Sequence, residues 1–270
     1  MAAIVHCVRH GQAWHNIQDH DPSLVDPRLT SLGRRQCRTL RKSCKARESR
    51  IGLIAASPLC RTIQTALLAF YPETHDEIRR PRILALPDAQ ETSPLPCDVG
   101  LDVRELQELC NDRYWPVDLS LVKPGWNSKS DGSRFAPIHI ALQERATDLR
   151  ATLYREAQRL PLRNGRMPEI VLVSHGQFLH FLTEDWEHAA KYTGTGWENC
   201  EMRSYELRID GSTAKRGPCL FETAKSRRKR GMTAKAPTQD LQGDMHLRAL
   251  KDWYDQGAFS PNLSFREQGC

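Results

Sequence analysis

Two nearly identical pentapeptides carry the residues best suited to chemistry: VRHGQ at 8–12 and VSHGQ at 173–177. Each follows an apolar run that fits a buried strand, so His10 and His175 would lie where two strands end. Ligands of open α/β sheets bind beyond the carboxyl ends of the strands, so both corners can face one pocket. The adjoining glycines would let the backbone approach a ligand, and the helix N–H groups that follow would favour an anion. These glycines are Gly11 and Gly176.

Two arginines would add positive charge to this pocket. Arg9 precedes the first histidine, and Arg61 lies one turn into a helix expected after the strand at 51–56, with its side chain directed toward the helix N-terminus. Two planar guanidinium groups suit the oxygens of a phosphate group. Nearby cations disfavour imidazolium, so a histidine between them stays neutral and can attack phosphorus through a ring nitrogen.

The rest of the pattern predicts elements that can position these residues. Short β-rich runs alternate with segments of helical period, which is typical of an α/β fold with a mostly parallel sheet. Thr30 can cap the first helix, and Pro58 suits the first turn of the second. The expected strands are 3–8, 51–56, 83–86, 170–173 and 205–209, and the longest expected helix is 137–160.

The 270-residue chain can form one full domain with additions. We expect a domain over residues 1–210, in which an insertion at 92–135, rich in Pro, Asp, Gly and Trp, covers the site. Residues 211–270 form a polar, basic extension with an expected helix near 244–254.

Charge and composition indicate which class of partner and which cellular compartment to expect. The 39 basic and 33 acidic side chains give a net charge of +6, which suits anionic partners in general. His6 and Arg9 interrupt the first apolar run and no long apolar run follows, so we expect a cytoplasmic protein without a membrane partner. The basic run KSRRKR at 225–230 would also suit a nuclear location, whereas nucleic acid is not expected as a partner.

Nine scattered cysteines without a C-x-x-C pair predict free thiols and no metal site. No feature of the sequence specifies an oligomeric state.

Four motifs, in order and spacing, resemble the histidine phosphatase superfamily, which includes the phosphoglycerate mutase-like proteins. They are R-H-G at 9–11, L-T-x-L-G at 29–33, S-P-L-x-R-T-x-Q-T-A at 57–66 and S-H-G at 174–176. The resemblance covers residues 4–210 and implies the three-layer sandwich of phosphoglycerate mutases around a mostly parallel sheet. Three further stretches are similar to a fungal branch of mostly uncharacterised members: LPDAQETSPLPCDVG at 86–100, DLSLVKPGWNSK at 118–129 and GTGWENCEMRSYE at 194–206.

The resemblance implies a role for each matching residue. His10 would be the nucleophile that becomes phosphohistidine, while Arg9, Arg61 and a protonated His175 would hold the phosphoryl oxygens. Asn16 matches a family asparagine that points into the same pocket.

The proton donor of the family, a glutamate after the third strand, would be Glu91. Asp88 three residues earlier, and Glu105 or Glu108 in RELQELC, remain alternatives. The donor would protonate the departing alcohol oxygen and, as carboxylate, activate the water that cleaves phosphohistidine.

The insertion offers two residues for substrate specificity. Trp126 could stack on a substrate ring or anchor the loop onto the sheet. Asn127 could bind substrate through its amide or close a turn with Gly125.

The expected activity is that of a phosphoric monoester hydrolase on a small phosphorylated molecule, with no metal and no cofactor. One alternative is a phosphomutase of the phosphoglycerate mutase kind, which a bisphosphorylated cofactor would activate. The other is a non-catalytic binding or scaffold protein on the same fold, which would form no phosphohistidine.

Overall fold

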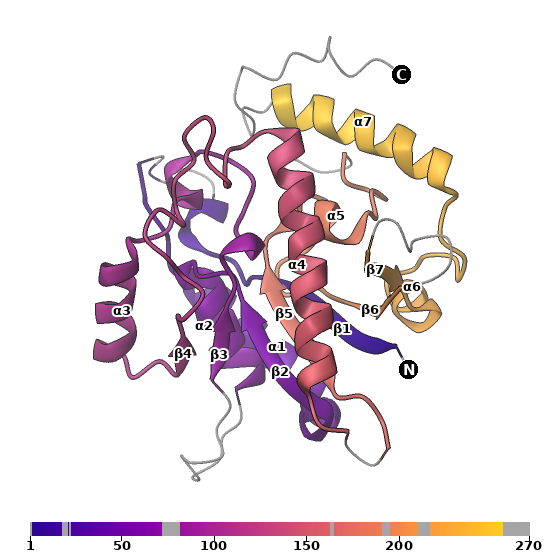
Figure 1. Ribbon diagram of the computed structural model, residues 1–270, viewed down its shortest axis with the longest axis horizontal. Coiled ribbons are helices and arrows are strands. Elements are labelled where there is room, and N and C mark those ends of the chain that lie inside the picture. Colours follow the sequence, from indigo (N-terminus) through magenta and orange to yellow (C-terminus); the bar gives the residue numbers. More distant parts are fainter. Residues whose placement is uncertain are drawn as a thin grey trace.

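The computed structural model describes residues 2–17, 21, 23–71, 82–162, 165–190, 195–209 and 217–255. Seven strands form one sheet in the order β4-β3-β2-β5-β1-β6-β7 (Figure 1). The strands are β1 (Ala3–Arg9), β2 (Ile51–Ala56), β3 (Ile83–Ala85), β4 (Val117–Asp118), β5 (Glu169–Ser174), β6 (Met202–Arg208) and β7 (Cys219–Glu222). The first five strands in spatial order are parallel, and β6 and β7 are antiparallel additions at one edge.

Helices cover both faces of the sheet. Helices α4 (His139–Arg159), α5 (Gly176–Thr183) and α7 (Gln239–Asp255) pack on one face, and α1 (Ser31–Cys44) and α2 (Cys60–Phe70) pack on the other. The expected α/β fold with three layers and a mostly parallel sheet is therefore confirmed.

The composition of strand β5 explains its place in the middle of the sheet. All six of its residues are buried. Ile170 and Leu172 face the core under α4 and α5, while Val171 and Val173 face the core under α1 and α2. A continuous apolar run of this kind is typical of a parallel strand that is covered on both faces.

Several element boundaries differ from the expected ones. The side chain of Thr30 caps α1 by accepting from the Gly33 N–H at 3.0 Å, as expected. Helix α2 begins later than Pro58, with Leu59 as its N-cap, and β6 begins at Met202 rather than at 205. Strands β4 and β7 were not expected from the sequence because both are short and lack a clear alternation.

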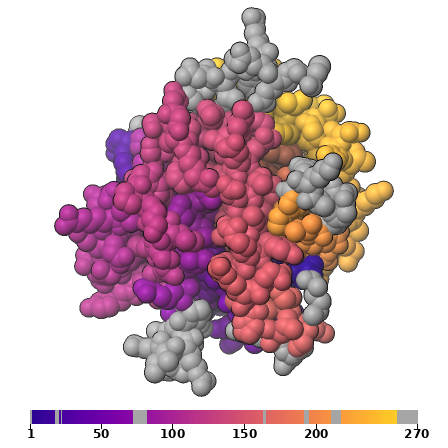
Figure 2. Space-filling view, in the orientation of Figure 1, coloured from indigo at the N-terminus to yellow at the C-terminus, as the bar shows by residue number. Residues whose placement is uncertain are grey.

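The insertion contains a short 3-10 helix (Pro96–Asp98), helix α3 (Val103–Asp112) and β4. Its apolar residues pack against Leu59 and Ile63 of α2 in a core of their own. Figure 2 shows this segment, in magenta, and α4, in salmon, as parts of one face.

The chain beyond residue 210 contributes to the sheet and the core. Strand β7 pairs with β6, and Leu250 and Trp253 of α7 lie in the same core as β1 and α4. Residues 211–216 and 256–270 of the expected extension, and Gly194, lie outside the described residues. The domain boundary at 210 stays a prediction.

The basic run at 225–230 forms most of α6 (Ala224–Lys229). Some of its side chains form buried ion pairs. Arg227 is 1% exposed and donates to Glu187 at 2.6 Å, and Arg230 donates to Glu222 at 2.7 Å. Two of the five basic side chains of the run are therefore structural. In the described part of the chain, no helix is long and apolar enough to cross a membrane.

Candidate active site

The sheet register brings the two His-Gly corners together. Arg9 and Ser174 are direct partners where the parallel strands β1 and β5 end. The histidines that follow have ring centroids 5.2 Å apart, and the His10 N–H donates to the Ser174 carbonyl at 3.0 Å. His10 and His175 are 2% and 0% exposed, so the corners meet inside the protein.

The hydrogen bonds of His10 define its tautomer. Its Nδ1 lies 2.7 Å from the Gly11 carbonyl oxygen, which can only accept, so Nδ1 carries the proton. The lone pair of Nε2 is then directed at Arg61, whose Nε–H donates to it at 3.3 Å. Burial, followed by the charges of Arg61 and Arg9, holds the pKa of His10 well below its usual 6.5. At neutral pH the ring is therefore uncharged, with a basic nitrogen inside the site.

Arg61 connects both corners to the insertion. This fully buried side chain lies in the first turn of α2. Its Nη2 donates to Nδ1 of His175 at 3.1 Å and to Oδ1 of Asp98 at 2.6 Å. Its Nη1 donates to the Cys97 carbonyl at 2.6 Å. These contacts hold the guanidinium in a fixed position beside both histidines.

His175 is held at both ring nitrogens. Nδ1 accepts from Arg61, so Nε2 carries the proton and donates to the Ser57 hydroxyl at 2.9 Å. Burial, and then the Arg61 charge, lowers the pKa of His175 well below 6.5. The expected protonated His175 is therefore wrong for this structure, because a ring nitrogen that accepts from a guanidinium carries no proton.

Arg9 supplies a second buried cation. Its Nη1 donates to the Trp197 carbonyl, and within the described residues its buried Nε has no hydrogen-bond partner. Burial lowers the pKa of Arg9, while the nearby Glu91 and Glu198 carboxylates raise it. A guanidinium with an unused donor in the interior can bind an anion.

Glu91 lies where α5 begins. Its Oε1 accepts from the N–H groups of Thr92 and Phe178, each at 3.0 Å, and its Oε2 accepts from the Gln177 N–H at 3.3 Å. Burial is the main reason that the pKa of Glu91 is raised above 4.5, and the Asp98 charge adds to it. This carboxyl group therefore keeps its proton to a higher pH than an exposed glutamate does.

The three alternative donors have other contacts. Asp88 forms a two-point ion pair with Arg134 at 2.8 and 3.0 Å on the surface. Glu105 accepts from the Asp102 N–H as part of the cap of α3. Glu108 is exposed beside Arg104. Among the four candidates, geometry favours Glu91.

The two glycines serve packing more directly than ligand approach. A Cβ at Gly11 would lie 2.9 Å from the Gly33 carbonyl oxygen, and the Gly11 N–H already donates to Thr65 at 3.0 Å. A Cβ at Gly176 would lie 2.1 Å from the hydroxyl of Thr195. Both glycines are thus required for close contact between elements, and their expected role in ligand approach stays a prediction.

Three predicted substrate ligands have local partners. Asn16 accepts from the Ala13 N–H through Oδ1 at 3.1 Å. Trp126 is 2% exposed and packs on Gly100, which favours the anchor over the stacking role. Asn127 donates to the Gly100 carbonyl at 2.8 Å and so closes its loop. The structure does not direct Trp126 or Asn127 into the space between the histidines.

Sequence reasoning missed residues that complete the site. Asp98, as described above, holds Arg61, and Ser57 holds His175. Lys129 donates to the Glu91 carbonyl at 2.7 Å, and burial, aided by the Arg145 charge, holds the pKa of Lys129 well below 10.5. Asp98 lies in the PCDVG stretch of the insertion and Lys129 in the PGWNSK stretch. The only signal in the sequence was a charged side chain in a segment that shows no helical or strand periodicity.

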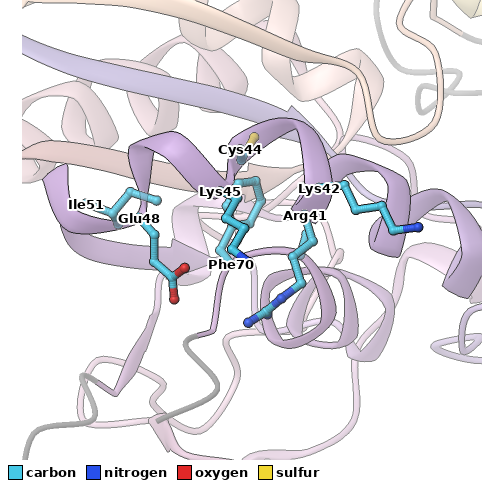
Figure 3. Close-up of a pocket in the computed structure, with 8 residues that line it drawn as sticks. Arg41, Lys42, Cys44, Lys45, Glu48, Ile51 and Phe70 are labelled. Atoms are coloured by element: carbon cyan, nitrogen blue, oxygen red, sulfur yellow. The ribbon is translucent and has the colours of Figure 1, made fainter.

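A separate pocket lies at the opposite end of the parallel strands, where β2 begins. Its volume is about 400 Å³, and its lining includes Arg41 and Lys45 near the end of α1 and Phe70 at the end of α2 (Figure 3). Ile51, where β2 begins, also borders it, whereas the histidines follow strand ends. Within the described residues, no group of three or more His, Cys, Asp or Glu is arranged to hold a metal ion.

Comparisons with known proteins show similarity to one superfamily. Residues 5–80 match the model of the histidine phosphatase superfamily, branch 1. A phosphoglycerate mutase-like protein of Arabidopsis thaliana is 26% identical over 240 residues, which are 74% of this chain and 82% of that protein. A protein of Schizosaccharomyces pombe named "probable phosphatase" is 28% identical over 105 residues, which are 38% of this chain and 48% of that protein.

Among solved structures, mycobacterial glucosyl-3-phosphoglycerate phosphatase with VO3 aligns with a TM-score of 0.49 and 18% identity. The alignment covers 82% of this chain and 97% of that one. The match to the family model includes the first corner and Arg61, which the structure brings together with the second corner. The chain is therefore similar to the histidine phosphatase superfamily over residues 5–80 and to phosphoglycerate mutase-like proteins over most of its length.

Proposed function

We propose that this protein is a metal-independent phosphatase that hydrolyses a small phosphorylated molecule through a phosphohistidine at His10. The observation that carries the proposal is the neutral His10 ring, with Nδ1 fixed by the Gly11 carbonyl and the Nε2 lone pair directed at Arg61. A phosphoryl group held by Arg61 would lie in front of that lone pair.

The first step forms the phosphoenzyme. Nε2 of His10 attacks phosphorus, the bond from phosphorus to the leaving oxygen breaks, and Glu91 donates its proton to that oxygen. Arg61 and Arg9 neutralise the charge on the equatorial oxygens, which accounts for most of the catalysis in phosphoryl transfer. The raised pKa of Glu91 supports its role, because the donor must hold a proton before it gives one.

The second step returns the protein to its starting state. The Glu91 carboxylate takes a proton from water, and the water oxygen attacks phosphorus. The bond from phosphorus to Nε2 of His10 breaks, and inorganic phosphate leaves. His10 is again neutral and Glu91 again protonated, so the cycle needs no other co-reactant.

Hydrolysis of p-nitrophenyl phosphate in EDTA tests the proposal. The wild-type protein should turn over with EDTA present, and His10→Ala should lose at least about a thousandfold in rate, because the nucleophile is gone. His188→Ala is a matched control, since His188 is exposed and lies in a turn before β6. Undiminished turnover by His10→Ala, or activity that EDTA abolishes and a divalent metal restores, would contradict the proposal.

A further inference from the structure

Two thiols lie in contact behind the first corner. Cys37 in α1 and Cys200, just before β6, are 163 residues apart in sequence, yet their sulfur atoms are 3.7 Å apart. Cys37 is fully buried, and Cys200 is half-buried. Neither side chain takes part in the mechanism proposed above.

The pair contacts the backbone that carries the nucleophile. The Cys200 N–H donates to the Arg9 carbonyl at 3.1 Å and to the His10 carbonyl at 3.2 Å. A Cβ built on Gly11 would lie 3.1 Å from the sulfur of Cys37 and 3.3 Å from that of Cys200. Movement of either sulfur is therefore passed directly to residues 9–11.

A small oxidant has a route to the pair. Cys200 borders a cavity of about 730 Å³ between α1 and the segment that precedes β6. Gln36 and Leu40, on either side of Cys37 in α1, border the same cavity. Cys200 is thus the sulfur that solvent reaches, with Cys37 directly behind it.

The contact also changes the acidity of Cys37. The hydrogen bond from Cys200 is the main reason that the pKa of the Cys37 thiol is lowered from 9.0. Burial instead raises the pKa of Cys110 to about 11. The same contact, and then burial, raise the pKa of the Cys200 thiol, so Cys37 is the sulfur of the pair that more readily forms the reactive thiolate.

We propose that Cys37 and Cys200 form a reversible disulfide with hydrogen peroxide as oxidant, and that this bond displaces the His10 corner and inhibits the protein. The thiolate of the pair attacks one peroxide oxygen, the O–O bond breaks, and a sulfenic acid and hydroxide result. The neighbouring sulfur then attacks the sulfenic sulfur, the S–S bond forms, and the S–OH bond breaks. The two protons of the thiols leave in two water molecules, so two thiols are oxidised and one peroxide is reduced.

Inhibition follows from the geometry of a disulfide. Its sulfur atoms are about 2.0 Å apart, so they must approach by about 1.7 Å from their present separation. Cys200 carries the N–H that holds the Arg9 and His10 carbonyls, and its movement shifts the attacking nitrogen. A displacement of about 1 Å at a reacting group can cost about a hundredfold in rate.

The test measures the bond and the activity separately. The protein is treated with hydrogen peroxide, free thiols are alkylated, and a linked Cys37–Cys200 peptide is sought by mass spectrometry before and after dithiothreitol. We expect the linked peptide only before reduction. This readout needs no turnover, so it stands even where the proposed phosphatase function fails. Absence of the linked peptide overturns the proposal.

Activity variants then test the inhibition. Peroxide should lower wild-type turnover of p-nitrophenyl phosphate by about ten- to a hundredfold, and dithiothreitol should restore it. Cys200→Ser and Cys37→Ser should each resist peroxide, and two variants guard against one that fails to fold. Cys110→Ser is the control, because Cys110 is another buried free thiol and lies in α3, outside the site; this variant should lose activity to peroxide as the wild type does. Equal loss of activity in both serine variants of the pair, or a linked peptide without loss of activity, refutes the inhibitory role.

Discussion

The two corners of the site differ at one position in five, Arg9 against Ser174, yet they hold their histidines in different ways. At the first corner Nδ1 of His10 carries the proton and donates to the Gly11 carbonyl, and Nε2 accepts from Arg61. At the second corner the tautomer is reversed, because Nδ1 of His175 accepts from Arg61 and Nε2 carries the proton and donates to Ser57. Identical residues at neighbouring strand ends therefore gain distinct roles from their partners.

The differing position separates the corners further. Arg9 and Ser174 are direct partners across β1 and β5. The Arg9 guanidinium adds a buried charge beside His10, whereas the Ser174 hydroxyl donates to the Ala89 carbonyl at 2.7 Å. That bond fixes the segment that carries Glu91. In the proposed mechanism, one corner supplies nucleophile and charge, and the other positions the proton donor.

The largest effects are expected when His10 and His175 are each replaced by alanine, because the two variants should differ in phosphoenzyme formation. His10→Ala should abolish formation of the phosphoenzyme. His175→Ala should slow turnover by about a hundredfold, because a positioning and charge-stabilising contact is lost, and should still form phosphohistidine. Quenched reactions followed by phosphopeptide mapping check this. Equal loss of phosphoenzyme in both variants would remove the distinction between the corners.

Glu91→Gln should cost about a hundred- to ten-thousandfold in rate and remove one limb of the pH profile. The donor must be protonated, so wild-type kcat/KM should fall as the pH rises through the pKa of Glu91, which lies above 4.5. The opposite limb should fall as His10 is protonated, below pH 6.5. A Glu91→Gln profile that keeps the alkaline limb contradicts this assignment, and Glu105→Gln serves as the control.

Ser57→Ala should act mainly on the second corner, although the Ser57 hydroxyl also accepts from the Leu59 N–H at 3.4 Å. The Nε2–H of His175 would lose its acceptor inside the protein, which should lower the free energy of unfolding by about 1–3 kcal/mol. The less firmly held ring should lower turnover by about tenfold. Thermal unfolding and steady-state rates measure both effects. A variant with the stability and rate of the wild type would show that this bond does not position His175.

Asp98→Asn should have the smallest effect on turnover, because it changes only the surroundings of Arg61 and Glu91. The Asp98 charge helps to raise the pKa of Glu91, so its removal should move the alkaline limb of kcat/KM to lower pH. The amide oxygen of asparagine can still accept from Arg61. An unchanged limb would indicate that Asp98 does not act on the proton donor.

The corners could be predicted because local patterns specify them. An apolar run, a histidine and a glycine define each strand end, and the parallel sheet then brings His10 and His175 together. Arg61 followed from its place one turn into α2. These inferences need only strand and helix periodicity, which the chain shows clearly over β1, β2 and β5.

The insertion and the C-terminal segment could not be predicted in the same way. Asp98 and Lys129 reach the site from loops, where no periodicity indicates the direction of a side chain. Trp126 faces the core because Gly100 leaves room for its ring, which is a contact between distant residues. The sequence shows Arg227 only as part of a basic run, and the fold is what places Glu187 beside it.

The central claim is that the His10 corner, and not the His175 corner, carries the phosphoryl group. The most direct measurement mixes the wild-type protein with p-nitrophenyl phosphate in EDTA at the pH of maximal turnover, quenches the reaction rapidly with alkali, and analyses the histidine peptides by mass spectrometry. We predict acid-labile phosphate on His10 that decays as inorganic phosphate forms. Phosphate on His175 or on another residue, or steady turnover without any phosphoenzyme, would contradict the claim.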